Sequence, residues 1–191
     1  PPPGGVSSAT ELVALIRSVE TRRCARHASA ALRAAVNPLT IAVAAFPSGN
    51  PAAGTSPAQE VERLLLKQAA GANFAITQLF WDPEVYISFV DDAKRAGVTI
   101  PILAGLLVPT DIERLSRTAE LTGIDPPQAL SQTLRDAEGA EAAVQAGILA
   151  TARVARAVLG SGAPGLHLYT YNKARPSLGL LARIGLFDPA A

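Results

Sequence analysis

The sequence predicts an α/β fold built on a parallel β-sheet. Short apolar runs alternate with amphipathic helical stretches, and this strand–helix repeat occurs four times along the chain. Each run is 7 or 8 residues long and apolar at both alternations, as in strands that are covered on both faces. Hydrophobic residues make up 49% of the 191 residues and charged residues 17%, so the chain can bury a sizeable core as one domain.

The first 38 residues precede the repeat. The opening PPPGGVSS is rich in Pro, Gly and Ser, which is typical of a loop. Residues 9–36 predict a helical stretch, and Asn37-Pro38 ends it because the residue before a proline avoids the helical region. Its arginines form either an anion-binding patch or, as the pattern favours, a solvated helix face; they are Arg22, Arg23, Arg26 and Arg33.

The repeat itself begins at residue 39. The predicted strands cover residues 39–46, 73–80, 100–107 and 165–171. The predicted helices cover residues 56–70, 82–97, 110–121, 137–159 and 175–184. Asp82-Pro83 marks a helix start, since Asp is a good N-cap and Pro is favoured in the first turn, and Gly97 ends that helix.

Parallel strands need right-handed crossovers, and four of them fit two architectures. They form either a small open sheet or half of an eight-stranded βα barrel whose other half precedes Pro1. In both architectures ligands bind at the carboxyl ends of the strands. Those ends lie at residues 46–47, 78–81, 105–109 and 169–173. The loop at residues 47–57 is long for a βα connection, which favours a functional or mobile segment.

Composition argues against several classes of function. Lys and Arg number 17 and Asp and Glu 16, and this net charge of +1 argues against a nucleic-acid partner. No apolar run approaches the roughly 20 residues of a membrane span. One cysteine, Cys24, gives no disulfide framework, so we expect a reducing, cytoplasmic location. His27 and His167 lie far apart and no glycine-rich nucleotide motif is present, so no metal or mononucleotide site is predicted.

Polar residues stand out on one strand and one helix. Gln78 lies near the end of an otherwise apolar strand, where either a ligand or neighbouring backbone must satisfy its amide. Glu60, Arg63 and Lys67 recur at spacings of three and four, and the pattern alone favours an exposed ladder of ion pairs. The alternative is a charged face toward a bound polyol or phosphate.

The last predicted strand carries three aromatic rings on one face, those of His167, Tyr169 and Tyr171. Such rings more often pack than support a cofactor. Lys173, just past the end of the strand, is placed to meet a carboxylate. Trp81 is as consistent with a surface plug as with a stacking group.

Four segments together resemble the methylenetetrahydrofolate reductase family. In chain order they are IAVAAFPSGNP (41–51), GANFAITQLFWD (71–82), IPILAGLL (100–107) and GLHLYTYNK (165–173). That family is a (βα)8 TIM barrel, and the chain resembles its last four βα units. The resemblance implies one βα-barrel domain over residues 1–191, with the N-terminal strands before Pro1.

The family reduces 5,10-methylenetetrahydrofolate to 5-methyltetrahydrofolate with NAD(P)H, through FAD. The resemblance therefore implies an oxidoreductase with a small-molecule folate substrate. It implies that Gln78 contacts folate and the nicotinamide in turn, and that Lys173 lies near the glutamate tail of folate. It also implies that Glu60, Arg63 and Lys67 bind the polar part of the flavin.

The chain departs from the family pattern at further site positions. In the flavin site Phe46 replaces a tyrosine and Asn50 a histidine. Arg114 replaces a folate-contacting glutamine, and Thr118 replaces a phenylalanine that packs on the cofactor. Each lost hydrogen bond removes about 0.5–1.5 kcal/mol, so we expect weak FAD binding. The general-acid glutamate of the family would precede Pro1, so no catalytic residue is predicted within the chain.

Two other functions remain open at this point. The altered pocket residues are consistent with a non-catalytic relative that binds folate or flavin and regulates another process. An unrelated βα-barrel lyase or aldolase would need a phosphate site after the last two strands, and the sequence has no glycine-rich loop there.

Overall fold

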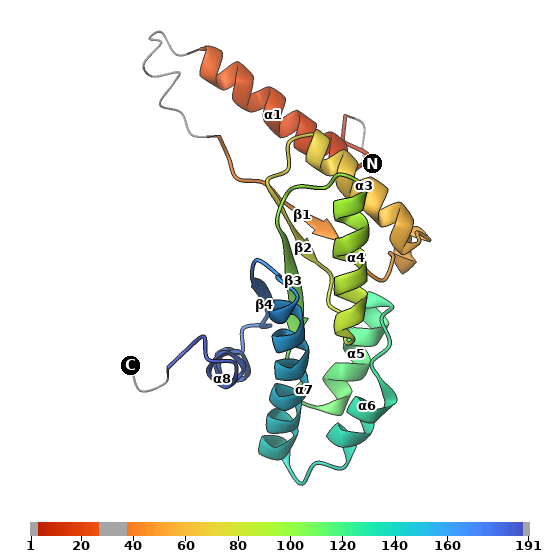
Figure 1. The fold of residues 1–191 in the computed structure, drawn as a ribbon, viewed down its shortest axis with the longest axis vertical. Coiled ribbons are helices and arrows are strands. Elements are labelled where there is room, and N and C mark those ends of the chain that lie inside the picture. Colours follow the sequence, from red (N-terminus) through yellow and green to blue (C-terminus); the bar gives the residue numbers. More distant parts are fainter. Residues whose placement is uncertain (1–3, 27–37, 189–191) are drawn as a thin grey trace.

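The computed structural model describes residues 4–26 and 38–188, and a four-stranded sheet lies at its centre (Figure 1). Its strands are β1 (Ala42–Ala45), β2 (Phe74–Thr77), β3 (Ile102–Leu107) and β4 (Leu166–Tyr169). They lie in chain order, and each adjacent pair is parallel. The predicted α/β fold of four βα units is therefore confirmed, with each strand shorter than the apolar run that predicted it.

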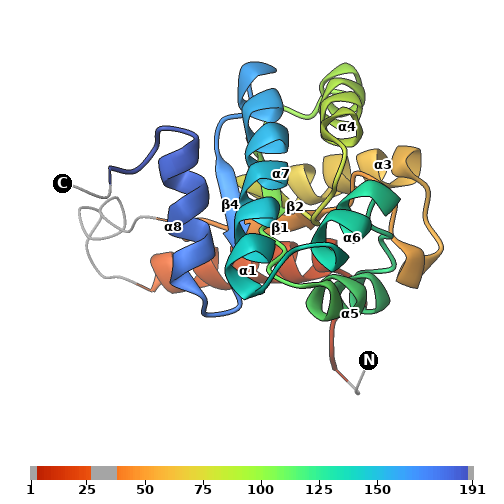
Figure 2. The same cartoon turned by 90° about the horizontal axis from the view of Figure 1, so that it is seen from below.

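Helices precede, connect and follow the strands. They are α1 (Ala9–Ala25), α3 (Pro57–Ala69), α4 (Pro83–Arg95), α5 (Ile112–Thr122), α6 (Gln128–Arg135), α7 (Ala140–Gly160) and α8 (Ala174–Arg183). One turn of 3-10 helix, Pro51–Ala53, lies in the loop between β1 and α3. The helices α3, α4 and α7 pack beside one another on one face of the sheet, and α8 packs on α7 (Figures 1 and 2).

The two faces of the sheet differ in burial. The face toward the helices carries small and branched residues of the core, Val43, Ala75 and Ala104. On the opposite face Ala42 and Ala44 are exposed and Ile76 is half-buried. The apolar runs predict strands covered on both faces, yet the described residues cover one. In a closed barrel the inner face of each strand is covered by the strands opposite. A sheet of four such strands, taken alone, has an uncovered inner face, as observed here.

The starts of α3 and α4 agree with the sequence. The Ser56 side chain accepts a hydrogen bond from the Gln59 N–H, the Gln59 side chain accepts one from the Ser56 N–H, and Pro57 opens the helix. Asp82 likewise accepts a hydrogen bond from the N–H of Glu84 at the start of α4. These caps fix the point at which each loop after a strand becomes a helix.

The N-terminal helix is anchored to the sheet by one arginine. Arg17 donates to the carbonyl of Gly71 and to Oδ1 of Asn73, at the amino end of β2. The other arginines described in this stretch, Arg22, Arg23 and Arg26, are exposed, so the solvated-face interpretation holds for them. The helix ends at Ala25 with Arg26 as its C-cap; residues 27–36 of the predicted stretch, which include His27 and Arg33, lie outside the described residues.

The helix predicted at 137–159 is corrected at its start. The structure places a separate helix, α6, before it and begins α7 at Ala140, because Gly139 adopts a φ of 95° between the two. A sequence signal for α6 existed. Pro126-Pro127 precedes an amphipathic segment in which Ser131 and Leu134 are buried.

The helix α7 comes close to the carboxyl end of β3. A Cβ atom on Gly147 would lie 1.8 Å from the carbonyl oxygen of Pro109, so this approach requires glycine. By length and composition alone α7 could cross a membrane, although core helices also meet that criterion. Buried α7 residues such as Ala152 and Ala155 pack in the main core.

Candidate functional site

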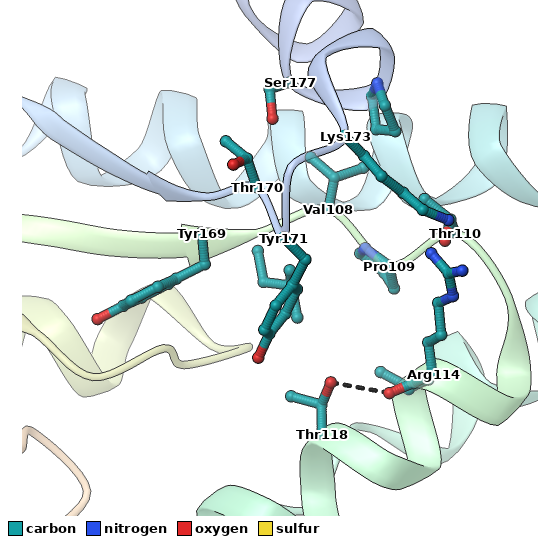
Figure 3. A pocket seen from close by; sticks show the side chains of 13 residues that line it. Val108, Pro109, Thr110, Arg114, Thr118, Tyr169, Thr170, Tyr171, Lys173 and Ser177 are labelled. Carbon is teal, nitrogen blue, oxygen red and sulfur yellow. Dashed lines mark hydrogen bonds between the residues drawn. The ribbon is translucent and has the colours of Figure 1, made fainter.

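The carboxyl ends of β3 and β4 line a shallow pocket together with the loops that follow them (Figure 3). The pocket is partly open to solvent, and its cavity measures about 40 Å³. This is room for little more than one water, so a larger ligand would lie across the mouth. The polar residues of the lining are Thr110, Arg114, Thr118, Tyr169, Thr170, Tyr171, Lys173 and Ser177.

Two cations lie on one side of this pocket. Arg114 is in the first turn of α5, with Nε 3.2 Å from Oδ2 of Asp111, the N-cap of the same helix. Lys173 is the N-cap residue of α8. Figure 3 shows both side chains extending toward Thr110. Neighbouring cations near helix N-termini suit a carboxylate or phosphate group.

Thr118 and Tyr171 face each other across the pocket (Figure 3). Thr118 is 5% exposed, and its hydroxyl donates a 2.8 Å hydrogen bond to the carbonyl of Arg114. The sequence places Tyr171 on the β4 face, but β4 ends at Tyr169 and Tyr171 lies in the turn beyond it, with a φ of 45°. The pocket thus has a small side chain on one wall and an aromatic ring on the other.

Tyr169 forms the part of the site nearest the sheet. Its hydroxyl donates a 2.9 Å hydrogen bond to the carbonyl of Thr77, and its ring meets His167 edge-on with centroids 4.8 Å apart. Burial, with a smaller contribution from Tyr171, raises the pKa of Tyr169. His167 and Tyr169 therefore pack, as the sequence predicts for these rings.

Gln78 continues β2 at its carboxyl end. Its N–H donates a 2.7 Å hydrogen bond to Ala45, and by strand alternation its half-buried side chain shares the open face with Ile76. Its Oε1 accepts a 2.9 Å hydrogen bond from the N–H of Leu79. The amide nitrogen has no hydrogen-bond partner in the described part of the chain. Neighbouring backbone therefore satisfies half of this amide, and two donors remain for a ligand.

Glu60 is a buried carboxylate near the carboxyl end of β1. It is 1% exposed, and its Oε1 accepts hydrogen bonds from Thr55 Oγ1 at 2.5 Å and from Arg63 at 2.9 Å. Its Oε2 is buried without a hydrogen-bond partner among residues 4–26 and 38–188. An unsatisfied buried acceptor is costly, so this oxygen suits a hydroxyl donated by a ligand.

Lys67 lies on the same face of α3 as Glu60, about two turns further along the helix. It is also buried, at 8% exposure. Its Nζ donates a 2.8 Å hydrogen bond to Ala44 and lies 6.0 Å from the centre of the Phe46 ring. Burial lowers the pKa of Lys67, against the opposing effect of Glu60. The exposed ion-pair ladder is therefore wrong for Glu60 and Lys67, although the Glu60–Arg63 pair forms.

The structure divides the predicted site residues into two groups. Arg114, Thr118 and Lys173 meet at the pocket of β3 and β4. The residues predicted to bind the flavin gather around the carboxyl end of β1 and the helix α3; they are Phe46, Asn50, Glu60, Arg63 and Lys67. Gln78 follows the strand between the two groups and is not part of the pocket lining.

The β1–α3 loop is closed by its own backbone. Asn50 and Thr55 exchange hydrogen bonds of 3.0 and 3.1 Å around the 3-10 turn. This long loop is therefore structured, and it holds Thr55 against Glu60.

Sequence reasoning missed the part that Tyr171 plays in the pocket. A signal was present, since Asn172 follows the end of the strand and Asn readily adopts positive φ in turns. Trp81 packs in a satellite apolar cluster with Leu115 and Leu134, which matches the plug and not a stacking group. Within the described residues, no three His, Cys, Asp or Glu side chains form a metal-binding group.

The sequence of this chain is similar to those of known proteins. A family model described as methylenetetrahydrofolate reductase matches residues 1–185. The chain is 31% identical over 157 residues to a probable methylenetetrahydrofolate reductase (NADH) of Oryza sativa subsp. japonica, and 34% identical over 155 residues to a probable methylenetetrahydrofolate reductase (NADPH) of Caenorhabditis elegans. It is 30% identical over 147 residues to the 5,10-methylenetetrahydrofolate reductase of Escherichia coli (strain K12).

The chain spans only part of these relatives. The three alignments cover 78%, 79% and 76% of this chain, but 26%, 23% and 49% of the respective relatives. A solved structure with a similar fold is described as an uncharacterized protein from Clostridium thermocellum that binds two copies of 5-methyl-5,6,7,8-tetrahydrofolic acid. Its TM-score is 0.50 at 21% identity, over 82% of this chain and 55% of that one.

Proposed function

Because the chain belongs to the methylenetetrahydrofolate reductase family, we propose that it forms the folate-binding half of an enzyme that reduces 5,10-methylenetetrahydrofolate to 5-methyltetrahydrofolate. The reductant is NADH or NADPH. The observation that carries the proposal is the meeting of Arg114, Lys173 and Tyr171 at the carboxyl ends of β3 and β4, where βα barrels hold their substrates. The aligned part of this chain covers about a quarter of the Oryza sativa relative and about half of the Escherichia coli relative. The activity is therefore proposed for the whole protein and not for this chain alone.

In this proposal the two cations bind the glutamate carboxylates of folate. Arg114 offers a planar guanidinium and Lys173 a compact ammonium, and both lie at the pocket where a ligand must cross the mouth. Asp111 holds the Arg114 side chain at its base through the 3.2 Å contact with Nε. The terminal guanidinium nitrogens have no hydrogen-bond partner among the described residues and can meet an anion.

Gln78 would orient the substrate next to the strand edge. Its Oε1 is occupied by the Leu79 N–H, so the free amide nitrogen presents donors on the open face of the sheet. A donor there can hydrogen-bond the oxygen or ring nitrogens of a pterin, and in turn the carboxamide oxygen of a nicotinamide. By holding each ring in turn at the same place, Gln78 would orient both the hydride donor and the hydride acceptor for their separate steps.

The residues around β1 fit the polar part of FAD, whose isoalloxazine, when bound, relays the hydride from NAD(P)H to the folate. The unsatisfied Glu60 Oε2 would accept a hydrogen bond from a ribityl or ribose hydroxyl. Lys67 retains donors beyond its bond to Ala44 and would meet a phosphate. Phe46 offers no hydroxyl, so one hydrogen bond of the site is missing and binding is weaker than with tyrosine there.

Proton transfer needs a group outside the described pocket. Its lining contains no aspartate or glutamate. In this proposal a glutamate from the strands that complete the barrel supplies the general acid, and the chain's own residues bind and orient the substrate. The reaction would take place in the cytoplasm.

The test is an assay of the full-length protein that carries this chain. NADH or NADPH oxidation is followed at its absorbance maximum with and without 5,10-methylenetetrahydrofolate, and 5-methyltetrahydrofolate is quantified by mass spectrometry. The proposal predicts oxidation that depends on the folate and forms product in a one-to-one ratio. Binding of folate without turnover with either nucleotide contradicts it.

A further inference from the structure

One residue at the proposed folate site has a backbone conformation that side chains rarely adopt. Tyr171 and Asn172 have φ values of 45° and 60°, the only positive φ of non-glycine residues in the part of the chain that the structure describes. The Lys173 N–H donates a 2.8 Å hydrogen bond to Thr170 and closes the turn around them. Asn tolerates this region, but a tyrosine in it is strained. Strain of this kind is concentrated at binding sites, where it persists because function requires it.

The turn keeps the Tyr171 ring out of the core. Tyr171 is 65% exposed, whereas Tyr86 is 1% exposed. Figure 3 shows the ring extending from the β4–α8 turn toward Thr118. Thr118 has a short side chain whose hydroxyl donates to Arg114 within α5, and among the described residues no hydrogen bond joins it to the Tyr171 hydroxyl. Packing within the fold therefore does not explain the position of the Tyr171 ring.

The charges beside the ring indicate what it contacts. Arg114 and Lys173 line the same pocket and suit carboxylates, so a ligand that uses all three residues has a planar ring joined to an acidic group. In folate the p-aminobenzoyl ring is bonded directly to glutamate. A pterin is separated from that acid by the whole benzoyl ring.

We propose that Tyr171 is a specificity-determining residue that stacks on the p-aminobenzoyl ring of the folate while Arg114 and Lys173 bind its glutamate. This inference rests on the proposed function and adds to it the residue that selects for the ring. The strained turn is retained because it presents the ring face across the pocket, and a relaxed turn would present it elsewhere. Stability is thereby given up for binding, as is usual at functional sites.

Four variants of the full-length protein separate the two roles of Tyr171. Tyr171→Phe keeps the ring, Tyr171→Ala removes it, and Tyr171→Gly removes it and relieves the strain. Asn172→Gly is the matched control, because it relieves strain at the adjacent residue and leaves the ring in place. Dissociation constants are measured by calorimetry for 5-methyltetrahydrofolate, p-aminobenzoylglutamate and 6-methyltetrahydropterin, and Tm is measured for each variant.

We expect Tyr171→Ala and Tyr171→Gly to weaken binding of 5-methyltetrahydrofolate about five- to tenfold, the usual value of an aromatic pair. The same variants weaken the binding of p-aminobenzoylglutamate to a similar extent and leave the affinity for 6-methyltetrahydropterin unchanged. Tyr171→Phe and Asn172→Gly bind within about twofold of the wild type. Both glycine variants keep or raise Tm, by roughly 1–3 °C.

Two results would overturn the inference. One is unchanged affinity of Tyr171→Gly for p-aminobenzoylglutamate, which would make the ring irrelevant to binding. The other is an equal loss for the pterin fragment, which would mean that the substitution disturbs the whole pocket. Failure of the proposed function is distinguishable from both, since it is seen in the wild-type protein as NADH or NADPH oxidation that does not depend on 5,10-methylenetetrahydrofolate, whatever the affinities of the Tyr171 variants.

Discussion

The hydroxyl of Tyr169 donates a 2.9 Å hydrogen bond to the carbonyl oxygen of Thr77, joining β4 to β2 across the strand between them. The tyrosine can cross because β3 carries Gly105 at that point. A Cβ atom there would lie 2.1 Å from the Thr77 oxygen and 3.0 Å from the Tyr169 ring. The hydroxyl of Thr77 also accepts a 2.8 Å hydrogen bond from the Gly105 N–H. Three strands are thereby locked together directly beside the pocket.

Gly105→Ala is expected to destabilise the fold by about 2–3 kcal/mol, because the methyl group has no room between the strands. Urea unfolding followed by circular dichroism measures the change. Gly160→Ala is the matched control, since no atom lies within 4 Å of a Cβ there, and its effect should stay within about 0.5 kcal/mol. Equal stability of the Gly105→Ala variant and the wild type would contradict the packing described here.

The buried hydroxyl of Tyr86 should make the protein less stable at high pH. Its hydroxyl donates a 2.7 Å hydrogen bond to Ile102, and burial raises the pKa of Tyr86 to about 12. The unfolded chain releases this proton near its ordinary pKa of about 10, so the contribution is complete below pH 10 and is lost between pH 10 and 12. The contribution of Tyr86 to the free energy of unfolding amounts to about 3 kcal/mol.

The measurement is the free energy of unfolding between pH 8 and 12 for the wild type and Tyr86→Phe. We expect the difference between them to shrink as the pH rises, because the phenylalanine cannot ionise. Tyr169 has a raised pKa as well and contributes to both curves equally, so the difference isolates Tyr86. Parallel curves over this range would show that Tyr86 does not titrate on unfolding.

Removal of either cation at the pocket should weaken folate binding. We expect Arg114→Ala and Lys173→Ala each to raise the Kd of 5-methyltetrahydrofolate about two- to tenfold, with the effect decreasing as salt is added. Arg117→Ala is the control, because Arg117 is an exposed cation on the same helix outside the pocket lining. Titration calorimetry at low and high ionic strength provides the test. If all three variants lose affinity equally, the overall charge of the protein and not the pocket governs binding.

The buried charges on α3 should govern flavin affinity. Glu60→Gln halves the acceptor capacity of the carboxylate, and Lys67→Met removes a cation while keeping the length of the side chain. We expect each variant to weaken FAD binding about tenfold or more, because both groups are buried and would lose charge-assisted hydrogen bonds to the ligand. Flavin fluorescence on titration with FAD measures this, with Lys94→Met, on the exposed side of α4, as the control. Unaltered affinity in Lys67→Met would place the flavin phosphates elsewhere.

The elements of the fold were largely readable from sequence for a physical reason. Parallel strands must alternate with helices, and caps such as Ser56 and Asp82 act within four residues, so the local pattern contains them. The helix α6 was not predicted because its eight residues barely exceed two turns, although two prolines mark its start. The length of the loop at residues 47–57 favoured a functional or mobile segment, and composition gives no sign of the backbone hydrogen bonds between Asn50 and Thr55 that shape it.

The site was less predictable than the fold. Burial of Glu60 and Lys67 depends on the position of α3 against the edge of β1, a tertiary relationship that helical spacing does not contain. Tyr171 shares strand spacing with Tyr169, and only the left-handed turn removes it from that face. For Gln78 the sequence predicted the position and left two partners open, a ligand or neighbouring backbone; the structure pairs its Oε1 with the Leu79 N–H and leaves the amide nitrogen for a ligand.

The most direct test of the central claim is the kcat/KM of the full-length enzyme for 5,10-methylenetetrahydrofolate after Gln78→Ala, at saturating NADH or NADPH. Gln145→Ala, an exposed glutamine on α7, is the matched control. If the strand ends hold the folate, Gln78→Ala lowers kcat/KM by at least about tenfold, while Gln145→Ala and the unfolding free energies of both variants stay near the wild-type values. A kcat/KM of Gln78→Ala equal to that of the wild type would show that the folate binds elsewhere.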